Sequence, residues 1–314
     1  MRVLPVLASH HSDPKSYPPG VAFMDNQYLP IAKAKISVSD FGLLHSDAIY
    51  DVVHVWKGAF FRLDDHLDRF FAGLEKPHMS IQFDKEPVIE ILHNSVALSG
   101  LRNSYVEFIC THGMSPTFSR DPRDAINQFI AFAIPFGSVA SSEQLKHGLH
   151  AAVTGFLRIP PESVDPTVKN YHCLDLVKGL YAAYDRGADT AILIDGNGNV
   201  SEGPGFNIFA VKDGKVTTPG SGVLKGITRQ TVFDICKAID IDCQPDDIYP
   251  ALLKRSDEVF ITSTAGGVMP VTRIDGQSIG SGVPGEKTGK ISDVYWKMHE
   301  DEAQRLVVRY ASNR

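Results

Sequence analysis

Short apolar runs separated by turn pairs recur along the chain. "GVAFMDNQYLPIAKAKISVSD" places such runs on either side of Asp25-Asn26, and "IYDVVHVWKGAFFRL" does so around Lys57-Gly58. Asn, Asp and Gly in a two-residue connection are typical of hairpin turns, and Asp213-Gly214 repeats the pattern. The sequence therefore predicts three hairpins. Further apolar runs predict strands in residues 104–113, 127–137, 149–161, 189–203 and 257–276.

Apolar positions with a helical period lie between these strands. In "LDDHLDRFFAGLEK", residues 63–76, the stripe Leu67, Phe70, Phe71 and Leu74 follows i, i+3, i+4, i+7. It predicts a helix capped near Asp64. Similar reasoning predicts helices in residues 178–187, 226–241 and 291–307.

Strand-rich halves with a few helices favour an α+β protein of two domains. The small and polar residues of "PFGSVASSEQLKHG" follow a proline between two patterned regions, which is typical of a linker. We therefore expect a small N-terminal domain in residues 1–136, a linker in 137–147 and a larger domain in 148–314.

Composition excludes several classes of partner. The 314 residues carry 31 Lys and Arg against 37 Asp and Glu, a net charge of −6, without a dense basic run, so nucleic acid is not expected. No apolar run approaches the roughly 18 residues of a membrane span. Pro5 and two histidines make the N-terminus a poor signal peptide. The four cysteines form no CxxC pair, so neither a metal site nor a disulfide framework is indicated. We expect a cytoplasmic protein.

Three features of the second half belong together chemically. Lys169 lies in "DPTVKNYHCLDLVKG", Glu202 follows a turn in "SEGPGFNIF", and "PGSGVLKGITRQTVF" is a Gly-rich approach to a helix N-terminus that suits an anion. Alone, each has an ordinary explanation: a solvated lysine, a solvated glutamate and a loop that needs glycine for its geometry. Together they supply what pyridoxal 5'-phosphate (PLP) requires, an amine, a carboxylate for the ring nitrogen and a phosphate cradle.

These segments, in this order, resemble the fold type IV (class IV) PLP-dependent aminotransferases, which include branched-chain, D-amino-acid and (R)-selective amine transaminases. The resemblance rests on "RLDDHLDR", "VKN", "SEGPGFNIF", "GVLKGITR" and "TSTAGG". It implies a small α/β domain, a larger domain with a β-barrel-like core, and a homodimer or higher homo-oligomer. It also implies that Lys169 forms the Schiff base, Arg69 binds the phosphate and Glu202 meets the ring nitrogen. The other cofactor-binding residues that it implies are Phe206, Asn207, Leu224, Gly226, Ile227, Thr228 and Thr264.

The family's activity leads to a hypothesis about the substrate. "HSD…YDV" and "YVE" are similar to the (R)-selective amine transaminases, so we expect amino transfer from an (R)-configured primary amine to a keto acid such as pyruvate, in two ping-pong half-reactions. Branched-chain or D-amino-acid transamination is the alternative, followed by an aminodeoxychorismate-type lyase and a non-catalytic module. Which arginine, if any, binds the acceptor carboxylate stays open. The expected substrate-binding residues are His45, Tyr50, Val52, Tyr105, Arg120, Thr264 and Ala265, although packing within strands explains several of them equally well.

Overall fold

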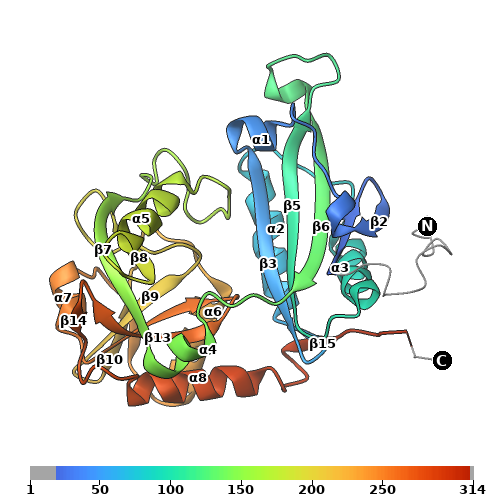
Figure 1. Ribbon diagram of the computed structural model, residues 1–314. Helices are drawn as coiled ribbons and strands as arrows, with labels where there is room; N and C mark the ends of the chain where they lie inside the picture. Colours follow the sequence, from blue (N-terminus) through green and yellow to red (C-terminus); the bar gives the residue numbers. More distant parts are fainter. Residues whose placement is uncertain (1–18, 312–314) are drawn as a thin grey trace. The chain divides into compact units, whose positions relative to one another are not determined.

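The computed structural model describes residues 19–311, and its contacts divide the chain into two compact units (Figure 1). Within the described residues, the first unit comprises 19–137, 168–171 and 301–311, and the second comprises 138–167 and 172–300. Both units combine helices with a sheet, in agreement with the expected α+β class. The N-terminal stretch that we interpreted as a poor signal peptide lies mostly in residues 1–18, outside the described part of the chain.

The first unit is built on an antiparallel sheet with the strand order β15-β4-β3-β5-β6-β1-β2. The hairpins at Asp25-Asn26 and Lys57-Gly58 are confirmed, and all four turn residues have a positive φ. The strands are β1 (Val21–Met24), β2 (Gln27–Pro30), β3 (Ala48–Trp56), β4 (Ala59–Phe61), β5 (Ser104–Met114), β6 (Ile126–Pro135) and β15 (Arg305–Val307). The helices are α1 (Phe41–His45), α2 (Leu63–Glu75) and α3 (Lys85–Ser99), with short 3-10 turns η2 (Ile31–Lys33) and η3 (Pro122–Asp124).

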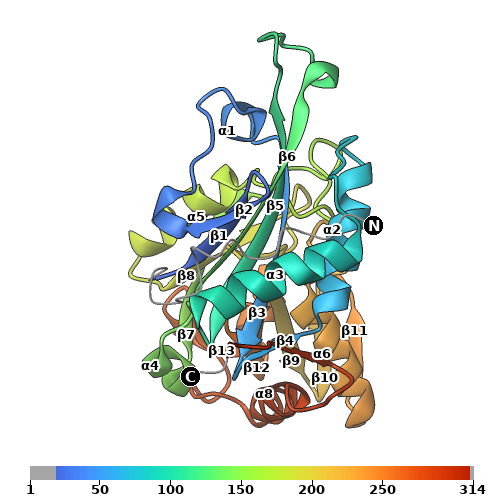
Figure 2. The same ribbon diagram turned by 90° about the vertical axis from the view of Figure 1, so that its right-hand side faces the viewer.

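Helices α2 and α3 cover one face of this sheet, and Figure 2 shows α3 lying across the strands. Val53 on β3 pairs with Val106 on β5, and both side chains belong to the core beneath the helices. Because side chains alternate along a strand, Asp51 points to the same covered face. Tyr50, Val52, Tyr105 and Glu107 occupy the alternate positions and share the opposite face.

The second unit holds a mixed sheet with the order β11-β10-β9-β12-β13-β7-β8, and β14 pairs with β13 at its side. This sheet corresponds to the expected core of the larger domain. The strands are β7 (Leu149–Leu157), β8 (Thr190–Ile194), β9 (Asn207–Lys212), β10 (Lys215–Thr218), β11 (Cys243–Pro245), β12 (Glu258–Ser263), β13 (Gly267–Ile274) and β14 (Gln277–Ser278). The helices are α4 (Ser142–His147), α5 (Leu174–Tyr184), α6 (Ile227–Ala238), α7 (Pro250–Lys254) and α8 (Glu286–Met298).

The N-terminus of one predicted helix and the C-terminus of another were wrong, and the expected linker contains a short helix. Helix α2 starts after Arg62, whose φ is 52°, and no side-chain cap holds its first turn, so Asp64 lies inside the helix. The predicted linker 137–147 contains α4, which Ser141 and Gln144 close with a capping box. The last predicted helix stops at Met298, because the chain turns back and residues 305–307 pair with β4. None of the helices in residues 19–311 is long and apolar enough to cross a membrane.

Candidate active site

Lys169 belongs to the first unit, although it lies within the predicted 148–314 domain. Val168 is buried in the core of the first unit, the Tyr50 N–H donates to the Lys169 carbonyl oxygen at 3.0 Å, and Asn170 forms an isolated bridge with Ile49. These backbone contacts fix the segment 168–171 along strand β3. The Lys169 Nζ then lies 4.4 Å from the centroid of the Tyr50 ring.

An acidic and aromatic cluster accompanies this lysine. The Tyr171 ring stacks on Tyr50 with centroids 4.3 Å apart, and the Tyr171 hydroxyl donates to Glu107 Oε1. Burial raises the pKa of Glu107, while the hydrogen bond from Tyr171 and the charge of Lys169 oppose that shift. Tyr50 and Tyr105 were predicted to contact substrate, whereas Tyr171 was missed. The sequence feature that could have indicated Tyr171 is its position, two residues after Lys169.

Arg69 projects from α2 onto a buried carboxylate. Its Nε and Nη2 donate to the two oxygens of Asp51 at 2.7 and 2.8 Å, and His66 Nδ1 lies 2.8 Å from Asp51 Oδ1. Burial raises the pKa of Asp51, but the charge of Arg69 and the bond to His66 outweigh it and hold the pKa well below its usual range. Burial lowers the pKa of His66, so a neutral ring donates from Nδ1 at pH 7.

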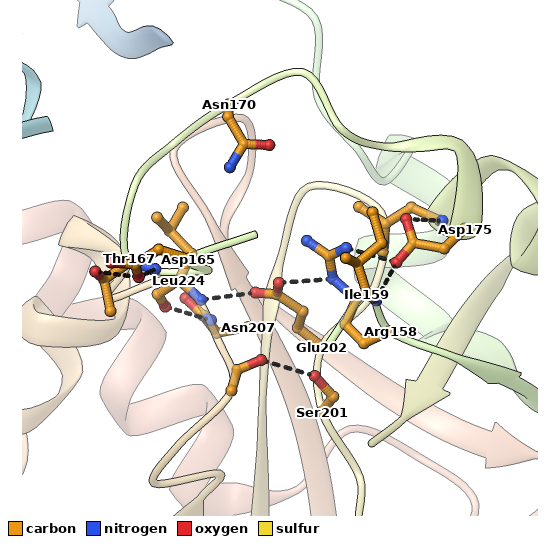
Figure 3. Close-up of polar contacts among 12 residues, drawn as sticks. Arg158, Ile159, Asp165, Thr167, Asn170, Asp175, Ser201, Glu202, Asn207 and Leu224 are labelled. Carbon is orange, nitrogen blue, oxygen red and sulfur yellow. Dashed lines mark hydrogen bonds and ion pairs between the residues drawn. The ribbon is translucent and has the colours of Figure 1, made fainter. Parts of the chain in front are cut away.

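Glu202 occupies a buried position of the second unit, between a cation and a backbone amide (Figure 3). Arg158 Nε donates to Glu202 Oε1 at 3.0 Å, and the Leu224 N–H donates to Oε2 at 3.0 Å. Arg158 Nη1 also donates to Asp175 Oδ2 at 2.6 Å. Burial lowers the pKa of Arg158, but the charges of Glu202 and Asp175 outweigh it and raise that pKa. The arrangement keeps Glu202 as an ionised acceptor of hydrogen bonds.

The loop before α6 is tied to the strand that follows Glu202. Asn207 Nδ2 donates to the Leu224 carbonyl at 2.9 Å, and Phe206 is buried. Gly226 caps α6 without a side-chain bond, and a Cβ at this position would lie 2.3 Å from Asn207 Oδ1. The first turn carries no acidic residue, so the N–H groups of Ile227 and Thr228 present the positive end of the helix dipole.

The remaining predicted residues have different surroundings. Thr264 and Ala265 follow β12, and the Ala265 carbonyl accepts from the Val139 N–H at 2.8 Å. His45 ends α1 and Arg120 lies on the β5–β6 loop; both are exposed. These two side chains are therefore outside the cluster around Lys169, whereas Tyr50, Val52 and Tyr105 share one sheet face with Glu107.

The groups present fit PLP. The first unit offers a half-buried lysine beside an aromatic ring, which suits imine formation. The second unit offers a buried carboxylate paired with an arginine, which suits a protonated ring nitrogen, and a helix N-terminus without acidic residues, which suits a phosphate. Within the part of the chain that the structure describes, no group of three or more His, Cys, Asp or Glu residues could hold a metal ion.

Comparison with known proteins agrees with this chemistry. The model of the family "Amino-transferase class IV" matches residues 48–274, so the chain belongs to the class IV aminotransferases. It is a PLP-dependent aminotransferase of fold type IV.

Three similar proteins illustrate the match. A Methanocaldococcus jannaschii protein provisionally named branched-chain-amino-acid aminotransferase is 31% identical over 87% of this chain and 94% of its own. The D-alanine aminotransferase of Staphylococcus haemolyticus is 26% identical over 90% of this chain and 98% of its own. The crystal structure of the Thermoproteus uzoniensis branched-chain aminotransferase with norvaline is 26% identical, with a TM-score of 0.85 over 92% of this chain and 99% of that one.

Proposed function

We propose that this enzyme moves an amino group from an (R)-configured primary amine without a carboxylate to a keto acid such as pyruvate, in a ping-pong sequence. The observation that carries the proposal is the setting of Lys169 in the first unit. Its Nζ lies over Tyr50, beside the hydrogen-bonded pair of Tyr171 and Glu107. These neighbours are aromatic and acidic, a poor match to an α-carboxylate.

Each residue has a separate task in this proposal. Lys169 Nζ would hold the cofactor covalently and, once the substrate amine has displaced it, would accept the proton from the substrate Cα and give it up again as the amino group is transferred. The Glu202 carboxylate would stabilise the proton on the cofactor's ring nitrogen. Arg69 and the N–H groups of Ile227 and Thr228 would bind the phosphate. When bound, PLP supplies the electron sink that makes the Cα–H acidic.

Glu107 supports the choice of a donor without a carboxylate. It lies opposite Val52 in the β3–β5 pair, on the face that also carries Tyr50 and Tyr105. In neither protonation state does a carboxyl group supply the positive charge that an α-carboxylate requires. Tyr50 and Tyr105 offer ring faces to an aryl or alkyl substituent instead.

Branched-chain or D-amino-acid transamination is the second candidate. The relatives that match over most of their length carry these two names, which favours an amino-acid donor. The exposed Arg120 on the β5–β6 loop would then be one candidate to bind the carboxylate. A lyase of the aminodeoxychorismate type would release pyruvate instead of consuming it.

A donor panel with pyruvate separates these candidates. The panel compares (R)-1-phenylethylamine, its (S) enantiomer, L-leucine and D-alanine, and alanine formation is measured. We expect the (R) amine to exceed the (S) amine by roughly a hundredfold, because a misplaced substituent costs a few kcal/mol. Equal enantiomer rates, or L-leucine far ahead of both, would favour the branched-chain activity. Turnover of D-alanine alone would favour the D-amino-acid activity.

We also propose a homodimer that uses the outer face of α5. Leu174 and Tyr181 are 68% and 67% exposed, and Val177 and Tyr184 continue the same helical stripe. A two-fold axis brings like surfaces together, so an apolar, tyrosine-rich stripe can pack against its own copy with the helix dipoles opposed.

We propose a cytoplasmic location because of the state of the cysteines. None of the four, Cys110, Cys173, Cys236 and Cys243, forms a disulfide in the part of the chain that the structure describes. Free thiols are typical of reducing compartments. Cell fractionation with an antibody would test the location.

A further inference from the structure

Asp51 is a charged residue in the middle of an apolar strand. Its side chain is fully buried, and His66 and Arg69, one turn apart on α2, both reach it. Oδ1 accepts from the Val52 N–H at 2.7 Å, from His66 Nδ1 and from Arg69 Nη2, and Oδ2 accepts from Arg69 Nε. Each oxygen of the buried carboxylate thus has a partner, which offsets the cost of removing it from water.

This geometry fixes the plane of the Arg69 guanidinium. Two parallel hydrogen bonds to one carboxylate hold the Nε–Nη2 edge, which a single contact would leave free to rotate. An anion that Arg69 binds then meets a guanidinium whose orientation is already set. His66 is a neutral donor here, so it holds Asp51 without cancelling the charge that pairs with Arg69.

We propose that Asp51 is the positioning residue for phosphate binding by Arg69, an inference that rests on the proposed role of Arg69. Buried ion pairs add little net stability compared with apolar packing, and their best-supported value is in fixing geometry. Asp51 orients the guanidinium before the cofactor arrives, so binding does not have to order a long side chain.

The test measures reconstitution of the apoenzyme with PLP and with pyridoxal, which lacks the phosphate. The variants are Asp51→Asn and the matched control Asp68→Asn, which removes an exposed carboxylate from the same helix, each in the wild-type and the Arg69→Met background. We expect Asp51→Asn to weaken PLP binding roughly 10- to 100-fold, to change pyridoxal binding less than about threefold, and to add nothing to Arg69→Met. Asp68→Asn should leave both dissociation constants unchanged.

Three results would overturn the proposal: unchanged PLP affinity in Asp51→Asn, an equal loss for PLP and pyridoxal, or a full further loss on top of Arg69→Met. If Asp51→Asn does not fold, Arg69→Lys replaces it. Lysine keeps the charge but cannot form the bidentate pair, so a loss near that of Arg69→Met supports positioning, and wild-type affinity contradicts it. Because no amine donor is used, an error in the proposed donor would leave these results unchanged. Absence of wild-type PLP binding would instead refute the proposed function itself.

Discussion

The Nε of Arg158 donates a 3.0 Å hydrogen bond to Oε1 of Glu202, so the carboxylate proposed for the cofactor's ring nitrogen is held by a positive charge. Arg158 also forms an ion pair with Asp175, so its single positive charge faces two carboxylates. The pair therefore orients Glu202 without fully neutralising it. This relationship leads to the first prediction.

Replacing Glu202 should slow the chemistry more than it weakens cofactor binding. Glu202→Ala removes the partner of the ring nitrogen, and a neutral ring is a poorer electron sink. We expect the rate of the amine half-reaction to fall on the order of 100-fold, while the PLP dissociation constant changes by less than about tenfold. Single-turnover loss of the cofactor absorbance measures the first quantity and equilibrium dialysis the second. Wild-type turnover in the variant would refute the assigned role.

Arg69→Ala should have the opposite profile. It removes a charge-assisted phosphate contact worth about 1.5–3 kcal/mol, so PLP should dissociate roughly 10- to 150-fold more readily. Saturating PLP should restore most of the activity. Arg123→Ala, which removes an exposed arginine paired with Asp121, is the control and should keep its cofactor. Full PLP retention in Arg69→Ala would show that the phosphate is bound elsewhere.

His299 should make the second unit sensitive to acid. It is buried beneath Tyr295 and Trp296 on α8, and burial lowers its pKa from 6.5 to about 4, while a bond to the Tyr295 carbonyl opposes the shift. The unfolded chain therefore takes up a proton at a higher pH than the folded one. Stability is fully present above pH 6.5 and is lost as the pH falls toward 4, by about 3 kcal/mol. As the pH falls from 7 to 4, the midpoint of urea unfolding should fall less steeply in His299→Gln than in the wild type. Equal slopes would contradict the prediction.

The homodimer can be tested on α5. Tyr181→Asp places a charge in the centre of the exposed stripe and should shift sedimentation toward the monomer. Val283→Asp makes the same kind of change at an exposed apolar residue of the second unit outside α5, and should remain dimeric. A dimer of unchanged affinity in Tyr181→Asp would exclude this surface.

The sequence predicted those elements whose structure depends on residues near one another in the chain. Asp25-Asn26 and Lys57-Gly58 tolerate positive φ, so both hairpins could be read from the sequence. The α2 stripe was equally clear. The N-terminus of α2 could not be predicted, because the helix begins after Arg62, which has a positive φ, and no acidic side chain caps it. Residues 305–307 look helical by composition, but pairing with β4, about 245 positions earlier, decides their state.

The candidate site needed long-range contacts that no motif contains. The three-residue spacing of His66 and Arg69 places both on one flank of α2, yet Asp51, which joins them, comes from another element. Its only sequence signal was a charge inside the apolar run "IYDVVHVW". Arg158 follows a strand like any ordinary surface cation, and nothing in "FLRIPP" indicates that Glu202 is its partner.

Covalent labelling tests whether Lys169 is the residue that holds the cofactor. The holoenzyme is reduced with borohydride and digested, and the pyridoxyl group is located by mass spectrometry. We expect a single label on Lys169, and we expect Lys169→Ala to be folded by circular dichroism but neither labelled nor active in amino transfer. Lys225→Ala, which changes an exposed lysine in the loop before α6, should label normally. A pyridoxyl group on any other lysine, or amino transfer by Lys169→Ala, would contradict this assignment.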